Sequence, residues 1–157
     1  MNKRVISVFV VFFVVILAIS SVNAVDLTHY NFDNHFSMKI PKGTTFELQE
    51  DSNQDIVDGM VFLSYVSEDN LVVMYADGPI ISEGSADYWF QSMFQSMNPD
   101  ATKCYESREG NLKILEPISN DGTQFPFVGI NEGNKTVMII GEDVDLLKEM
   151  GHTLKFK

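Results

Sequence analysis

A long apolar run near the start separates a short leading segment from the rest of this chain. Residues 5–19 are apolar except for Ser7, and two basic residues precede them. Small residues ending in Ala24 then lead to the first acid, Asp26. A basic start, an apolar stretch and small residues before a cut are typical of a secretory signal peptide. We therefore expect cleavage between Ala24 and Val25.

An uncleaved membrane anchor is the alternative interpretation of the same segment, residues 1–24. A transmembrane helix needs about 20 mostly apolar residues, and residues 5–25 come close to that length. The basic residues would hold the N-terminus inside, so both forms place the remainder outside the cytoplasm. We expect residues 25–157 to form a single globular domain, secreted or exposed at the cell envelope, that meets the membrane only through an uncleaved N-terminal segment.

The expected domain is strongly acidic. The whole chain holds 11 basic and 22 acidic residues, and removal of Lys3 and Arg4 leaves a net charge of about −13. Such a surface repels phosphate backbones and anionic lipid, so we expect no nucleic-acid partner. We interpret the acidic composition as a source of solubility outside the cell. The alternative interpretation is that the surface binds cations weakly or binds a basic partner.

Alternating apolar residues predict strands in the first half of the domain. Two short strands alternate apolar with polar residues around a Pro-Lys-Gly turn at 41–43. Residues 60–66 and 71–76 are nearly all apolar and predict a hairpin covered on both faces. The expected inward residues of the first two strands are Phe36, Met38, Ile40, Phe46 and Leu48.

Two helices are expected at 85–98 and 142–150. Ser85 can cap the first helix, and Asn98 ends it because the residue before a proline avoids the helical region. Gly151 is expected to end the second helix. The apolar residues of the first helix fall on one face, which predicts packing against the sheet. They are Trp89, Phe90, Met93, Phe94 and Met97.

Two hairpins are expected at 102–118 and 124–140, each with Glu-Gly-Asn at its turn. Gly110 and Gly133 tolerate the positive φ that tight hairpins require. A last strand would follow with Leu154 and Phe156 inward. The order of strands, helix, strands, helix and strand predicts an α+β fold, a mostly antiparallel sheet with two helices.

The export segment, the strand "FSMKIPKG" and this order of elements resemble the PsbP/Mog1-like family of small exported proteins. The resemblance implies a three-layer α/β/α sandwich and a tendency toward accessory or binding roles. It implies no reaction, and no functional residue carries over. The chain departs from the family at Thr44 and Thr45, where members often have an aromatic residue after the proline turn.

Residues with catalytic chemistry are few. Cys104, the only cysteine, alternates with polar residues, so we interpret it as a half-buried small side chain rather than a nucleophile, which would need a nearby base. His29, His35 and His152 lack the spacing of a metal site. We therefore expect no catalytic, cofactor-binding or metal residues and no cofactor.

Two weaker patterns remain. Asp51, Asn53 and Asp55 begin as a calcium loop does, but the later glycine and glutamate of that motif are absent. A looser calcium site with Asp58 stays open. Asn134 begins the pattern Asn-Lys-Thr, an acceptor for N-glycosylation, on an expected turn.

These observations favour an exported, non-catalytic domain that binds a protein or a small ligand at the cell envelope. The alternatives are a hydrolase or metal-dependent enzyme with dispersed active-site residues, and a structural envelope component. The partner itself is not identified. The Lys-, Asn-, Ile- and Asp-rich composition with a single cysteine suits an anaerobic microbe, and we expect an archaeal source.

Overall fold

A seven-stranded sheet joins the two halves of the chain. The computed structural model describes residues 25–49, 60–78, 83–101, 103–118 and 124–157. Within them the strand order is β3-β4-β5-β9-β8-β7-β6, and the pairs are antiparallel. The strands are β3 (Phe46–Leu48), β4 (Val61–Ser67), β5 (Val72–Asp77), β6 (Lys103–Glu109), β7 (Leu112–Ile118), β8 (Phe127–Glu132) and β9 (Lys135–Ile140). The chain halves meet where β5 pairs with β9.

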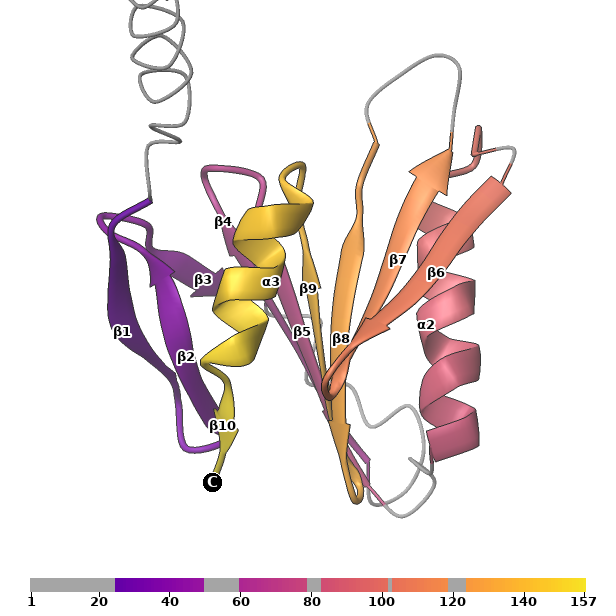
Figure 1. The fold of residues 1–157 in the computed structure, drawn as a ribbon. Coiled ribbons are helices and arrows are strands. Elements are labelled where there is room, and N and C mark those ends of the chain that lie inside the picture. Colours follow the sequence, from indigo (N-terminus) through magenta and orange to yellow (C-terminus); the bar gives the residue numbers. More distant parts are fainter. Residues whose placement is uncertain (1–24, 50–59, 79–82, 102, 119–123) are drawn as a thin grey trace, which may run out of the picture.

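The fold has three layers, and this sheet is the middle one (Figure 1). Helix α2 (Glu83–Met97) covers one face. Helix α3 (Val144–His152) and a small sheet cover the other. The small sheet has the order β1-β2-β10 and consists of β1 (Leu27–Phe32), β2 (Phe36–Pro41) and β10 (Lys155–Phe156). The predicted α+β fold, mostly antiparallel with two helices, is confirmed.

An aromatic cluster fills the space between the two sheets. Phe36 stacks on Phe32 with ring centroids 4.6 Å apart and on Tyr75 at 5.5 Å. The Tyr75 hydroxyl donates to Asp77 Oδ2 at 2.9 Å, and burial raises the pKa of this phenol well above its usual range. The buried hydroxyl is therefore satisfied, as a buried polar group must be.

The expected strand faces are largely confirmed. Phe36, Met38 and Ile40 are fully buried, and β9 is buried on both faces from Thr136 to Ile140. The hairpin of β4 and β5 is covered less completely than expected, because α2 packs mainly against β8 and leaves the second face of β4 half-exposed. Leu48 was expected inward but is 40% exposed, since it ends an edge strand.

Turn glycines adopt the backbone expected of them. Gly110 and Gly133 both have φ of +61° in the hairpin turns, and Gly43 has φ of +93° after the proline. A positive φ at the first of the two turn residues suits a two-residue hairpin, because the twist of such a turn matches the twist of the flanking strands.

Strand β1 is absent from the sequence-based expectation. Its residues show a mixed burial pattern, exposed at His29 and buried at Phe32, because β1 is an edge strand packed on one side only. The pattern of one short half-buried edge strand is too weak to stand out from a polar loop.

The start of α2 and the limits of α3 differ from the prediction. Helix α2 begins two residues earlier, at Glu83, so Ser85 lies inside it rather than capping it. Its last residue is Met97, next to the expected end at Asn98, which precedes Pro99. The backbone N–H of Asn98 and its Nδ2 both donate to the carbonyl oxygen of Phe94, at 2.9 and 3.1 Å. The first helix stripe packs on the sheet, with Phe90 and Phe94 buried.

Gly151 was expected to end α3 but lies within it, and the helix continues to His152. A Cβ at this glycine would lie 3.1 Å from both Leu112 and Val128, so the residue permits close approach of helix and sheet. The close packing of α3 on the sheet therefore favours a glycine at position 151. At the other end of the helix, Asp143 caps the start of α3 by accepting from the backbone N–H of Asp145 at 3.0 Å.

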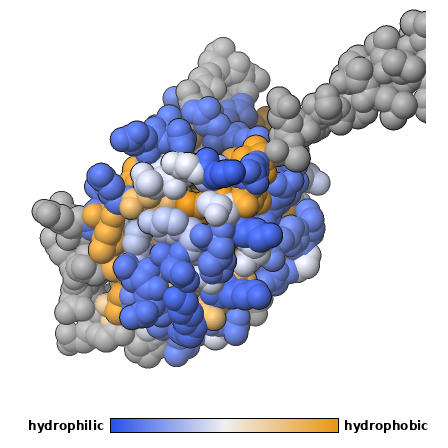
Figure 2. Space-filling model, turned by 90° about the vertical axis from the view of Figure 1, so that its left-hand side faces the viewer, coloured by the Kyte–Doolittle hydropathy of each residue, from blue (hydrophilic) through white to orange (hydrophobic). Residues whose placement is uncertain are grey.

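The face shown in Figure 2 is predominantly hydrophilic, with hydrophobic residues in a band across its middle and along one side. Among the described residues, no helix has both the length and the apolar character needed to cross a membrane. Residues 1–24 lie outside the described part, so the expected leader or anchor stays a prediction.

Gly129 on β8 allows α2 to lie close to the sheet. A Cβ at this position would lie 1.7 Å from the ring atom Cζ of Phe90, a distance that no real contact reaches. The Phe90 ring thus occupies the space that any other side chain would need.

We predict that Gly129→Ala destabilises the fold by about 1–3 kcal/mol, because the added methyl displaces the Phe90 ring. Urea unfolding measures this loss. In a Phe90→Leu background, where the colliding ring atoms are gone, the same substitution should cost clearly less. Equal costs in both backgrounds would contradict the contact.

Candidate functional site

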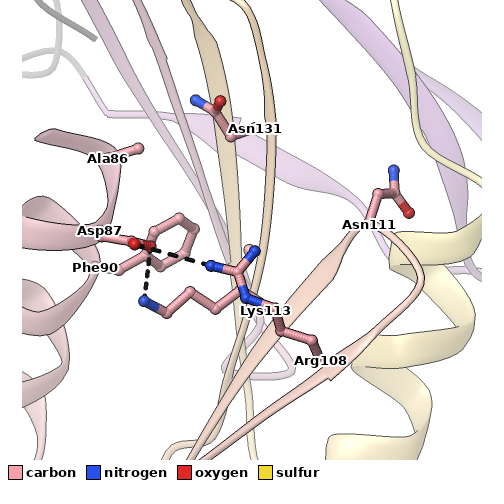
Figure 3. A pocket seen from close by; sticks show the side chains of 8 residues that line it. Ala86, Asp87, Phe90, Arg108, Asn111, Lys113 and Asn131 are labelled. Atoms are coloured by element: carbon pink, nitrogen blue, oxygen red, sulfur yellow. Dashed lines mark hydrogen bonds and ion pairs between the residues drawn. The ribbon is translucent and has the colours of Figure 1, made fainter. Parts of the chain in front are cut away.

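A pocket of about 260 Å³ lies between the first turns of α2 and strands β6 to β8 (Figure 3). We call it the α2 pocket. One helix, three strands and one hairpin turn line it. The lining residues are Ala86, Asp87 and Phe90 of α2, Arg108 of β6, Asn111 of the β6–β7 turn, Lys113 of β7, and Gly129 and Asn131 of β8.

Sheet register places the charged residues of the pocket in one row. Lys113 is directly opposite Arg108 on one side and Gly129 on the other. Directly paired residues project to the same face of a sheet. Since Gly129 faces Phe90 of α2, all three positions face this helix.

The Lys113 side chain is buried, with 8% of its surface exposed. Its ammonium donates to Asp87 Oδ1 at 2.7 Å and lies 3.3 Å from Glu106 Oε1. A buried charge is tolerated only when it is paired and hydrogen-bonded. Lys113 thus connects the first turns of α2 to strands β6 and β7 through its ion pairs with Asp87 and Glu106.

Arg108 is held more loosely. Its guanidinium lies 3.8 Å from Asp87 Oδ2, beyond hydrogen-bond distance, and 56% of its side chain is exposed. Figure 3 shows it directed from β6 toward Asp87, beside the Lys113 ammonium. The same carboxylate therefore faces two cations, one tightly bound and one not.

Asn131 lies apart from this charged group, farther along β8 (Figure 3). Its amide nitrogen donates to Thr136 Oγ1 at 2.7 Å and to the Lys135 carbonyl oxygen at 3.3 Å. Both donors are used within the hairpin, so the orientation of the amide is fixed. Its carbonyl oxygen remains as an acceptor.

Cys104 is exposed, not half-buried as the sequence predicts, because β6 is the edge strand of the sheet. It lines a different hollow of about 360 Å³ that is bordered by Gln91 and Asn98 of the α2 region. Desolvation and the nearby Glu106 carboxylate raise the pKa of its thiol. The thiol form, which is the weak nucleophile, is therefore favoured.

The three histidines have separate contacts. His29 is on β1, His35 packs its ring 4.8 Å from that of Tyr75, and the His152 ring nitrogen Nε2 lies 2.8 Å from Glu109 Oε1. Within the described ranges, no three His, Cys, Asp or Glu side chains gather as metal ligands would.

Other predicted positions have separate locations. Asn134 is exposed on the β8–β9 turn as expected, whereas Thr136 of the same pattern is buried in β9. Val25, where the cleaved chain would begin, is 42% exposed. Asp51, Asp55 and Asp58 lie outside the described residues, as does Ala24.

Sequence reasoning did not identify the α2 pocket. One signal was present, because Lys113 interrupts an apolar strand that is otherwise buried. A lysine in such a strand requires an acidic partner. The identity of that partner depends on how α2 lies across the sheet, which the local pattern does not contain.

We predict that Lys113→Met lowers stability by about 1–2 kcal/mol at neutral pH, because Asp87 and Glu106 lose their shared cation. The difference should shrink as acid protonates both carboxylates, since the ion pairs are then also lost in the wild type. Denaturant unfolding at several pH values measures it. Lys148→Met, which removes a surface pair with Asp145, is the control and should cost less than about 0.5 kcal/mol.

We also predict slow alkylation of Cys104 by iodoacetamide near neutral pH, relative to an unstructured cysteine peptide. Glu106→Gln should accelerate the reaction, because it removes a charge that raises the thiol pKa. Glu109→Gln on the same strand is the control. Equal rates for the two variants would contradict the assigned cause.

Comparison with known proteins yields a likeness in fold. No known protein-family model matches the chain, and a search of curated protein sequences finds no match. The solution structure of cyanobacterial PsbP (CyanoP) from Synechocystis sp. PCC 6803 superposes with a TM-score of 0.52 at 13% sequence identity, covering 88% of this chain and 96% of that one. The predicted resemblance to the PsbP fold is thereby confirmed.

Proposed function

We propose that this chain is an exported, non-catalytic domain that binds a protein or small ligand outside the cytoplasm. The observation that carries the proposal is the α2 pocket, where charged and amide side chains from separate elements converge on one hollow. A few placed polar groups in a concave site are typical of binding sites. The PsbP-like fold is compatible with a non-catalytic domain.

The chemistry of the pocket favours binding over catalysis. Its buried cation, Lys113, is neutralised by two carboxylates, which suits a fixed recognition surface rather than a nucleophilic amine. The nucleophile outside it, Cys104, is kept in its protonated form, and its Sγ contacts the Tyr105 carbonyl oxygen at 3.8 Å. Desolvation and Glu106 raise the pKa of this thiol more than the nearby Lys113 lowers it, so the thiol is not activated.

The proposed location outside the cytoplasm rests on the sequence of residues 1–24. We predict that intact mass measured on the native protein shows the loss of these residues, with Val25 as the new N-terminus. A full-length mass in the membrane fraction would support the anchored form of the same proposal. A full-length mass in the cytoplasmic fraction would overturn the proposed location.

The binding part of the proposal is tested in the same fractions. Tagged protein is cross-linked in place, and bound proteins and small molecules are identified by mass spectrometry. A partner counts only if Arg108→Gln abolishes its recovery while Lys103→Gln, on the same strand outside the pocket, preserves it. Recovery that is indifferent to both substitutions would contradict binding at the α2 pocket.

A further inference from the structure

Three polar groups of the α2 pocket have hydrogen-bonding capacity left over. Arg108 has only the 3.8 Å contact with Asp87 among the described residues, so most of its donors remain available. Asn111 makes no hydrogen bond with the described part of the chain. Asn131 has its carbonyl oxygen left after both amide donors are used. The pocket thus offers unused donors and unused acceptors together.

The charges balance when Glu106, which lies outside the lining but pairs with Lys113, is counted with those of the pocket. Asp87 and Glu106 carry two negative charges, and Lys113 and Arg108 carry two positive ones. The chain as a whole is acidic, with a net charge of −11. A ligand with net negative charge would be repelled at long range, whereas a ligand carrying both charges would not.

The positions of these groups suggest where a ligand's negative and positive ends would bind. Arg108 can receive a carboxylate in a charge-assisted pair, and the Asn111 amide lies at another part of the pocket wall (Figure 3). Asp87 Oδ2, which no donor in the described residues reaches within hydrogen-bond distance, can accept from an ammonium group. Ala86 and Phe90 supply an apolar wall, and the volume of about 260 Å³ limits the ligand to a small one.

We propose that the α2 pocket binds a small zwitterion of the α-amino acid type. Its carboxylate pairs with Arg108, its ammonium pairs with Asp87, and its short side chain lies against Phe90. This assignment rests on the proposed function, because it names the ligand class for the same binding site.

Isothermal titration of the full-length protein in detergent with L-alanine tests the assignment. Two matched probes each lack one charge: propionate has no ammonium group and ethylammonium has no carboxylate. We expect L-alanine to bind at least about tenfold more tightly than either, because each probe leaves one set of polar groups unpaired. No binding of L-alanine at about 10 mM would overturn the proposal. Equal binding of propionate would also overturn it and would indicate a simple anion site.

Variants locate the site. Arg108→Gln should weaken L-alanine binding at least about tenfold, and Asn111→Ala should weaken it less. Lys103→Gln should leave it unchanged. These side chains are exposed, so the variants are expected to fold, and circular dichroism verifies this. Binding that survives Arg108→Gln would overturn the assignment.

The outcome separates this inference from the proposed function. If L-alanine does not bind but cross-linking recovers a partner that depends on Arg108, the ligand class is wrong and the binding function stands. If neither is found, both proposals fall.

Discussion

The pairing of β5 with β9 is the constraint on which the rest of the fold depends. It aligns Val72 with Ile140 and Asp77 with Lys135, residues far apart in the chain, and thereby joins the two strand groups into one sheet. The residues between these strands must leave β5, cross the sheet as α2 and return from its opposite edge through the meander of β6 to β9. A pairing this distant in sequence closes a long loop, so it depends on the burial achieved on both faces.

Burial on those two faces could be read in part from the sequence. The stripe of Phe90 and Phe94 and the alternation from Phe36 to Ile40 predict one buried face each, and the structure buries them. Their local period is enough, because a side chain's direction follows from its place in a helix or strand. Gly151 shows the limit, since its role as a contact point between α3 and β7 or β8 appears only once the layers are assembled.

The candidate site lies beyond that limit. Lys113 is recognisable as an anomaly within an apolar strand, but its partner Asp87 comes from a helix on another layer. The position of Asp87 is set by the approach of Phe90 to Gly129, a single steric relation that no periodicity encodes. The resemblance to PsbP-like proteins gave the layers correctly, and at 13% identity it reaches no further than the fold. The pocket therefore follows from tertiary contacts particular to this chain.

The two edges of the large sheet differ in how they are protected. β3 is a strand of three residues, and β6, with seven, alternates basic and acidic side chains at Lys103, Glu106 and Arg108. Short length and charge are two of the devices by which natural sheets avoid pairing with strands of other molecules. The acidic net charge adds a repulsion between copies. A sheet guarded in this way is a poor template for fibre growth, so the fold is suited to remain dispersed in crowded surroundings that would aggregate a sheet with bare edges.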